Sequence, residues 1–415
     1  MNPRAALALG LSLLIVGAVP HPPPRSRAVA SFGIPATPML PGSVIPLSID
    51  GLTPPYGIEL LGTGHLNASS YVAPERANGP VTLVAANQTA VATRTLVFAP
   101  PPAADTAFIA VASYDDGVVI HDAAPPFARR SILGVGGAPA DVTIDPQGRI
   151  AAGATDGTTA VIATIAPWSV QAVEGVPFSD EAAFDDKTQA AFFTDRDTNG
   201  AGAITRVSAD GQIRTRVLGL TAEGIAIDSK RRRAYVANTN DGTISIVDLD
   251  SMVELDRFAA VSRVFSLALN ASGSRLYAVS NQSYTSPFGA AGSVIAIDVA
   301  ATKPRIVAKS APLAFPVGLA LDQRRNRLFV TDERDDDVYV LSPLTLHAVH
   351  APLPTCRTPW KPLVDRGTLY LPCARANEID AIDTSTFRRR PGAPFATGGY
   401  PLAVAVWHPQ PNVKR

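Results

Sequence analysis

Short runs of apolar residues, each ending in a polar residue, recur along most of this chain. Clear examples are VTID, GIAID and GLALD, which end at Asp145, Asp228 and Asp322. Apolar runs of this length bounded by turn residues predict β-strands, and no segment shows the sustained periodicity of a helix. The pattern therefore predicts an all-β protein. The complete series of run ends is Asp145, Asp185, Asp228, Asn270, Asp322, Asp365 and His408.

These runs have a regular spacing. Successive ends lie 40 to 43 residues apart, except for 52 residues between Asn270 and Asp322. A second series, which includes the runs ending at Asp122, Asp248 and Asp298, repeats with a similar period. Four short antiparallel strands in each repeat describe the blade of a β-propeller. Because both series count seven units, we predict a seven-bladed β-propeller over residues 104–409.

One repeat carries a family resemblance. Residues 231–258 read RRRAYVANTNDGTISIVDLDSMVELDRF, and looser copies occupy residues 328–345 and 369–386. This sequence closely resembles the YVTN family of β-propeller repeats, and the resemblance covers about residues 105–409. It implies the propeller fold but no particular activity, because propellers carry many unrelated functions.

The two ends of the repeat region complement each other. The first unit starts at Phe108 without a preceding inner strand, whereas the last apolar run, at residues 402–409, has no partners in its own unit. We predict that these segments pair and complete one blade. Such closure removes the exposed sheet edges that invite aggregation.

The chain begins with the pattern of an export signal, residues 1–30. Arg4 precedes an apolar run from Ala5 to Val19, and cleavage is expected after Ala18 or Ala30. Because 15 apolar residues are fewer than the roughly 20 of a spanning helix, a removed signal peptide is favoured over a retained anchor. We expect an exported protein, periplasmic, cell-surface or extracellular, without a transmembrane span in the mature chain.

Residues 31–103 precede the repeats. Strand-like stretches at residues 44–49, 57–61, 81–86 and 92–98 alternate with Pro- and Gly-rich turns. They predict a small immunoglobulin-like β-sandwich module that ends in a Pro-rich linker. A module of this size is marginally stable alone, so we expect it to pack on the propeller. Residues 410–415 form a short tail.

Composition narrows the choice of partners. The 36 Lys and Arg residues balance 36 Asp and Glu residues, so no net charge attracts the chain to nucleic acid. The two cysteines, Cys356 and Cys373, map to loops of one face. We favour a disulfide between them over two free thiols, because export exposes them to an oxidising compartment.

The repeat order indicates where a site would lie. Loops that enter the inner strands share one face with the loops between second and third strands, around the channel. The insertion at residues 281–292 lengthens one of these loops, either as a contact surface or as variable padding. The predicted ligand- or partner-binding residues on this face are Tyr114, Asp156, Asp195, Arg196, Asn238, Arg263, Tyr284, Phe288, Arg334, Trp360 and Arg375.

Three carboxylates stand nearest the starts of inner strands: Asp180, Glu181 and Glu223. Such oxygens could bind a divalent metal such as calcium, although ordinary solvated turn residues are the favoured alternative because no D-x-D-x-D-G loop is present. No other cofactor is predicted. No histidine maps to this face, which disfavours Ser-His-Asp hydrolysis and histidine-ligated metal chemistry there.

These features favour a non-catalytic scaffold that binds an envelope protein or a small ligand through the channel-mouth loops. The main alternative is a metal-dependent lactonase-like hydrolase or lyase that uses the carboxylates of this face, an analogy that rests on fold alone. A third hypothesis is an electron-transfer dehydrogenase subunit, which would need a further cofactor or partner. The sequence does not decide whether the protein is an enzyme, but it favours a protein without catalytic activity.

Overall fold

The computed structural model describes residues 30–52, 54–67, 69–76, 79–88, 90–196, 200–281 and 291–410, with Arg196 described by its backbone only. All regular structure in this part of the chain is β-strand, as predicted. Within it, no helix has the length and apolar character needed to cross a membrane. Residues 1–29 of the predicted leader, Tyr284 and Phe288 lie outside the described residues.

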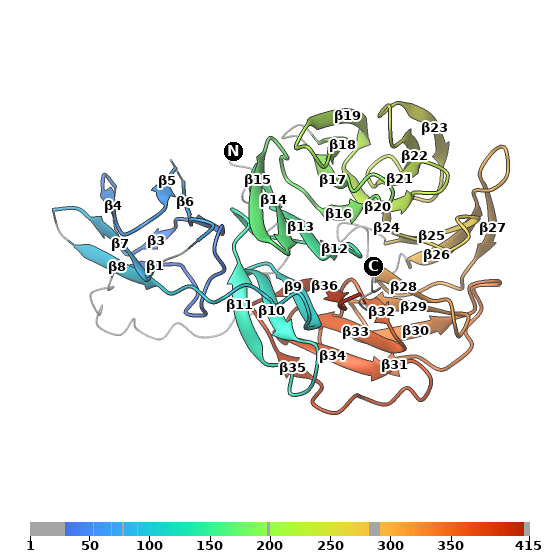
Figure 1. Ribbon diagram of the computed structural model, residues 1–415. Helices are drawn as coiled ribbons and strands as arrows, with labels where there is room; N and C mark the ends of the chain where they lie inside the picture. The colour runs from blue at the N-terminus through green and yellow to red at the C-terminus, as the bar shows by residue number, and fades with distance from the viewer. Residues whose placement is uncertain are drawn as a thin grey trace, which may run out of the picture.

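Seven antiparallel sheets of four strands each form a ring over the described part of residues 108–407 (Figure 1). Six of them use four consecutive strands, from β12–β15 to β32–β35, and the seventh has the order β11-β10-β9-β36. The strands are β9 (Phe108–Ser113), β10 (Gly117–Asp122), β11 (Arg129–Leu133), β12 (Thr143–Ile144), β13 (Arg149–Gly153), β14 (Thr159–Ile165), β15 (Trp168–Glu174), β16 (Glu181–Phe184), β17 (Ala191–Arg196), β18 (Ala201–Val207), β19 (Ile213–Leu220), β20 (Ala222–Asp228), β21 (Arg233–Asn238), β22 (Thr243–Asp248), β23 (Glu254–Ala259), β24 (Val264–Leu269), β25 (Arg275–Ser280), β26 (Ser293–Asp298), β27 (Arg305–Lys309), β28 (Pro316–Asp322), β29 (Arg327–Asp332), β30 (Asp337–Leu341), β31 (Leu353–Pro354), β32 (Leu363–Asp365), β33 (Thr368–Cys373), β34 (Glu378–Asp383), β35 (Phe395–Ala396) and β36 (Pro401–Trp407).

The ring closes by pairing its two ends. Strand β36 pairs antiparallel with β9, with Trp407 opposite Phe108, so the predicted closure is confirmed. The first strands of the other six sheets and β36 of the closing sheet contact one another around the centre, which makes them the innermost strands (Figure 1). Pairing between segments almost 300 residues apart makes the ring a single cooperative unit.

Burial decreases from the inner and middle strands to the rim. All six residues of β9 are buried, whereas β27 is exposed along most of its length. Middle strands are covered on both faces by the neighbouring sheets, so they appear in the sequence as continuous apolar runs rather than as alternating ones. Phe192 and Phe193, adjacent on β17, are both fully buried for this reason.

The acidic ends of the inner strands have a structural role. Asp145, Asp228 and Asp322 are buried and accept backbone N–H groups of Arg149, Arg231 and Arg325 in the next turn, at 2.8, 2.9 and 3.1 Å. A short carboxylate that bonds nearby backbone is a common means of fixing tight turns. The acidic residue that recurs in the sequence therefore marks a turn that several repeats form in the same way. We call this side of the ring the turn face and the opposite side the mouth face.

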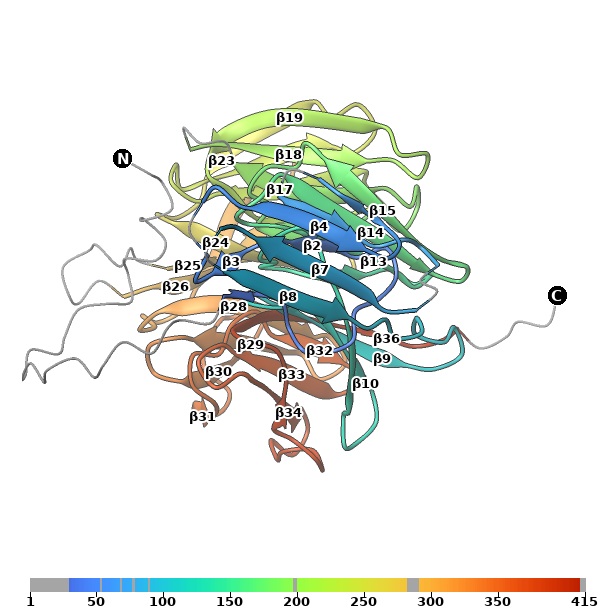
Figure 2. The ribbon, with the colours of Figure 1, turned by 90° about the vertical axis from the view of Figure 1, so that its left-hand side faces the viewer.

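The N-terminal region forms three small sheets, with orders β1-β3, β2-β6-β5 and β4-β7-β8. They lie beside β11 and β15 of the ring (Figures 1 and 2). Three of the four predicted strand regions coincide with β4, β7 and β8, whereas the stretch at residues 44–49 divides into β2 and β3. The strands are β1 (Ser31–Phe32), β2 (Val44–Pro46), β3 (Ile49–Asp50), β4 (Gly57–Leu61), β5 (His65–Leu66), β6 (Ser70–Val72), β7 (Val81–Ala86) and β8 (Val91–Leu96).

Main-chain hydrogen bonds attach this region to the ring. The segment at residues 38–44 runs along β11: Leu40 N–H donates to Ile132 O at 2.7 Å, and Ile132 N–H donates to Pro38 O at 3.0 Å. The indole N–H of Trp168 donates to Pro41 O at 3.1 Å. The segment therefore covers an edge strand that would otherwise expose unpaired backbone groups.

Candidate functional site

A cluster of three charged side chains, those of Lys361, Glu181 and Asp141, lies at the centre of the mouth face. Lys361 Nζ lies 3.0 Å from Glu181 Oε1 and donates to the carbonyl oxygen of Asp180 at 3.3 Å. Lys361 precedes β32, whereas Glu181 begins β16, three sheets further around the ring. The lysine therefore reaches across the channel. Both side chains are almost buried, with exposed fractions of 14% and 10%.

The carboxylates of this cluster are held by the inner strands of the next sheets. Glu181 Oε2 accepts the Ile225 N–H at 2.7 Å, and Asp141 Oδ2 accepts the Ala182 N–H at 3.0 Å. Strand β20 has an irregular register between Ala222 and Ile225. Such a bulge removes a backbone donor from the sheet ladder and redirects it, here toward the centre.

Burial dominates the electrostatics of this cluster. It raises the pKa of Glu181 to about 7, although the Lys361 ammonium opposes the shift. Burial also raises the pKa of Asp141. Both effects arise because a carboxylate removed from water favours its neutral form. Nearby, burial raises the pKa of Asp195 to about 6, against a 2.6 Å hydrogen bond from Thr205 Oγ1.

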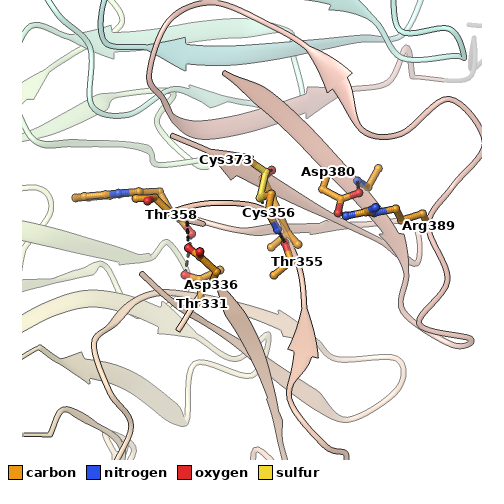
Figure 3. The surroundings of a disulfide bond; sticks show 11 residues. Thr331, Asp336, Thr355, Cys356, Thr358, Cys373, Asp380 and Arg389 are labelled. Atoms are coloured by element: carbon orange, nitrogen blue, oxygen red, sulfur yellow. Dashed lines mark hydrogen bonds and ion pairs between the residues drawn. A yellow bond between two sulfur atoms is a disulfide. The ribbon is translucent and has the colours of Figure 1, made fainter. Parts of the chain in front are cut away.

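The segment that carries Lys361 is fixed at several points. The disulfide joins Cys356 to Cys373 on β33, with 5.6 Å between their Cα atoms (Figure 3). Thr358 N–H donates to Asp336 Oδ1 at 2.7 Å, and the Trp360 carbonyl accepts the Thr331 hydroxyl at 2.8 Å. A cross-link and hydrogen bonds to β29 and to the loop that follows it thus hold residues 355–362 in one conformation over the mouth.

Aromatic and basic side chains surround the central cluster. Trp360 meets Phe265 of β24 edge-on, with 6.1 Å between ring centroids. The Arg334 guanidinium lies 5.6 Å from the centroid of Phe315. Tyr114 and Tyr400 form a second edge-on pair at 6.3 Å. Loops and inner strands of four sheets therefore contribute aromatic and cationic side chains to this face.

Several residues singled out in the sequence have internal roles. Asp156 Oδ1 accepts the Ala138 N–H at 2.8 Å, which fixes a mouth loop. Asn238 is fully buried and donates to Thr243 and Ser245. These side chains shape the face rather than offer free ligand groups. Those that remain at least partly accessible are Tyr114, Arg263, Arg334, Trp360 and Arg375.

The three carboxylates predicted as metal ligands are Asp180, Glu181 and Glu223. Among the described residues, no three His, Cys, Asp or Glu side chains are grouped as potential metal ligands. Glu181 is paired with Lys361, and a Glu223 oxygen accepts the Thr239 hydroxyl at 2.6 Å. An ammonium lies where the sequence suggested a metal ion.

Lys361 and Asp141 were not predicted from the sequence as site residues. Both stand two residues before an inner strand, at the position that faces the centre of the mouth. This shared position is the signal that could have identified them. The ion pair between Lys361 and Glu181 could not have been found in this way, because these two residues belong to different repeats on opposite parts of the ring.

Comparison with known proteins gives the fold class. No family model and no curated protein matches the chain. Among solved structures, a Bacteroides fragilis protein described as a 6-phosphogluconolactonase covers 73% of this chain and 98% of its own, with 12% identity and a TM-score of 0.59. Virginiamycin B lyase from Staphylococcus aureus covers 61% and 83%, with 14% identity and a TM-score of 0.51.

A third similar structure is the β-propeller domain of Swd1 from Myceliophteria thermophila, which covers 68% of this chain and 94% of its own, with 11% identity and a TM-score of 0.54. Likeness at this identity shows the fold alone. The protein is accordingly an all-β chain with a β-propeller fold, and the fold is shared with enzymes of different activities.

Proposed function

We propose that the protein is an exported, non-catalytic scaffold that binds an envelope protein or a small ligand through its mouth face. In this proposal the ring is a seven-bladed propeller of the YVTN type, and the N-terminal region is an immunoglobulin-like module. The seven four-stranded sheets and the three small N-terminal sheets support these assignments. The domain limits are those predicted from the sequence.

The central cluster is the observation that carries the scaffold proposal. Lys361 forms an ion pair with Glu181, and backbone N–H groups donate to the second oxygen of Glu181 and to one oxygen of Asp141. A divalent cation at this place would have to displace a buried ammonium. The surrounding aromatic and arginine side chains instead resemble the anchors that are enriched in protein interfaces.

The metal-dependent lactonase or lyase alternative is tested directly. Elemental analysis of the purified protein is expected to show no stoichiometric divalent metal, and thermal melting is expected to be the same with calcium and with a chelator. A panel of lactones should show no turnover above buffer. A bound metal whose removal lowers the melting temperature would replace the scaffold proposal with the enzyme hypothesis.

Export is tested on the full-length chain. Expression with its own leader followed by cell fractionation and N-terminal sequencing should give a mature chain that begins after Ala18 or Ala30. An uncleaved chain recovered from the cytoplasm would contradict this part of the proposal.

A further inference from the structure

Positive charge is concentrated in one part of the turn face. The sheets that begin at β28 and β32 are neighbours in the ring, and each has two loops on this face. The four loops are residues 322–327, 342–352, 365–368 and 383–394. They contain seven arginines and three aspartates, without a lysine or a glutamate. The arginines are Arg324, Arg325, Arg327, Arg366, Arg388, Arg389 and Arg390.

The turn face elsewhere shows that this excess is local. The corresponding loops of the sheets that begin at β16 and β20 contain five basic residues and six aspartates, over residues 185–190, 208–212, 228–233 and 248–253. Arg232 of these loops lies 2.6 Å from both Asp185 and Asp250. Basic residues on that side of the ring are therefore balanced by nearby carboxylates.

The three aspartates of the arginine-rich loops already have basic partners. Asp322 pairs with Arg325 at 3.4 Å, Asp383 with Arg390 at 2.9 Å, and Asp365 with His408 at 2.7 Å. Arg389 pairs with Asp380 of β34 at 2.9 Å. Each of these carboxylates is therefore occupied by its own partner.

Three arginines remain. Arg324, Arg366 and Arg388 are exposed and have no ion pair in the described part of the chain. The acids of the two flanking loops do not supply one, because Asp298 pairs with Arg305 and Asp122 pairs with Arg130 within their own sheets. A net positive charge therefore persists at the surface of the four loops.

Other arginines of this group converge on one turn. Arg390 Nη2 donates to the Gly367 carbonyl oxygen at 3.2 Å, and a Cβ atom at Gly367 would lie 3.1 Å from Arg325 Nη1. Arg327 donates to the Thr384 carbonyl oxygen, and the Thr384 N–H donates to Gly367 O at 2.9 Å. Guanidinium groups from two sheets are thus held close together, which strengthens the local positive potential.

An exposed apolar loop adjoins these arginines. Between β30 and β31, Leu344 is 67% exposed and Val349 is 54% exposed. His350 of the same loop packs on Phe387, with 4.4 Å between ring centroids, and the Arg327 guanidinium lies 4.6 Å from the Phe387 centroid. We define the basic patch as the seven arginines together with Leu344 and Val349. The N-terminal region lies beside β11 and β15 and leaves this part of the ring uncovered (Figure 1).

This combination of side chains indicates the kind of partner. A soluble polyanion would contact the arginines but would leave Leu344 and Val349 in water. An anionic membrane surface satisfies both groups, because lipid phosphates lie next to the apolar boundary of the bilayer. Paired N–H donors of guanidinium groups suit phosphate oxygens.

We propose that the basic patch docks the protein on an anionic lipid membrane, with the arginines on the lipid phosphates and with Leu344 and Val349 at the headgroup boundary. This inference goes beyond the scaffold function and does not depend on it. Because the mouth face is on the opposite side of the ring, a docked molecule keeps that face in solution, where it remains accessible to a partner.

The test is vesicle flotation with the oxidised mature protein. Vesicles of phosphatidylcholine alone are compared with vesicles that also contain about 30% phosphatidylglycerol, in about 0.1 M NaCl. The patch variant is Arg324→Gln/Arg366→Gln/Arg388→Gln. Its matched control, Arg76→Gln/Arg214→Gln/Arg357→Gln, removes the same charge from exposed positions outside the patch that have no ion pair in the described residues. Thermal melting checks that both variants remain folded.

The wild type should float with the anionic vesicles and not with the neutral ones. The patch variant should bind about tenfold more weakly or worse, while the control should differ from the wild type by less than about twofold. Leu344→Ser/Val349→Ser should also weaken binding, and about 0.5 M NaCl should release the protein.

Three results would overturn the proposal. A wild type that does not float with anionic vesicles has no membrane-docking surface. Equal losses in the patch variant and the control would show that binding depends on total charge and not on the patch. Heparin that displaces the protein completely, together with unchanged flotation of Leu344→Ser/Val349→Ser, would replace the membrane by a soluble polyanion. None of these results bears on the mouth face, so the scaffold proposal is tested separately.

Discussion

The two faces of this propeller satisfy many of their charges in different ways. On the turn face, a buried carboxylate at the end of an inner strand bonds the backbone of its own turn and an arginine within the same short stretch, as Asp228 does with Arg231. On the mouth face, charges are satisfied over long distances, as between Lys361 and Glu181, or have no carboxylate partner among the described residues, as for Arg334. The turn face maintains the repeat, and the mouth face differs from one sheet to the next.

The pKa values follow the same division. Hydrogen bonds from Ser385 and the Thr386 backbone hold the pKa of Asp383, on the turn face, far below its usual value. On the mouth face, burial raises the pKa of Asp195 to about 6 and that of Asp332. Local donors stabilise the charged form on one side, whereas desolvation without enough donors disfavours it on the other. Asp186, on the turn face, is an exception with a raised pKa.

The largest expected effect comes from removing the cross-channel lysine. Lys361→Met should lower the free energy of unfolding by about 3–5 kcal/mol, because it leaves Glu181 and Asp141 buried without their counter-ion. Urea denaturation measures the change. Lys361→Met/Glu181→Gln is the matched control and should recover part of the loss. Equal stability of the single variant and the wild type would show that the pair has no structural role.

The disulfide should contribute almost as much. Cys356→Ser/Cys373→Ser removes a link between residues that are 17 positions apart. Because this link restricts the unfolded chain, its loss should lower the free energy of unfolding by about 3 kcal/mol. Denaturation of the wild type in dithiothreitol should reproduce the variant. If the reduced wild type remains as stable as the oxidised protein, the mouth segment is held by its hydrogen bonds alone.

Arginines of the two faces provide a direct contrast. Arg232→Gln should cost about 2 kcal/mol, because Arg232 is only 15% exposed and pairs with the fully buried Asp185. Arg334→Gln should change stability by less than about 0.5 kcal/mol, as expected for an exposed side chain without an ion pair. Chemical denaturation measures the free energy of unfolding of both variants. A similar decrease in the two variants would contradict the distinction between the faces.

The last expected effect is a pH dependence, which is spread over more than two pH units. The pKa of Glu181 is raised to about 7 in the folded protein, so between its ordinary value and pH 7 the native state holds more protons than the unfolded state. Its stabilising contribution is complete below the ordinary pKa and is lost as the pH rises to 7, by at most about 1.4 kcal/mol per pH unit.

Glu181→Gln should remove this decline, and the difference between variant and wild type, measured by melting from pH 4 to pH 8, isolates it from the opposite contributions of turn-face carboxylates such as Asp383. Parallel profiles for the two proteins would contradict a raised pKa at Glu181.

The sequence by itself determined what depends on local patterns. Apolar runs at a fixed period gave the strands and repeats, the unpaired ends at Phe108 and residues 402–409 gave the closure, and Asp145 and its equivalents marked a turn that each repeat builds from its own residues. These features involve neighbours in the chain or regular repetition, so they leave a periodic signal.

Only the tertiary structure decided which residues contact one another on the mouth face. Lys361 meets Glu181 because ring closure brings two distant loops to the same centre, and residues 38–44 cover β11 because an edge strand has unpaired backbone groups to share. Likewise, whether an arginine has a carboxylate within reach depends on the loops of adjacent sheets. Such contacts join residues whose positions share no periodicity, so the sequence pattern contains no record of them.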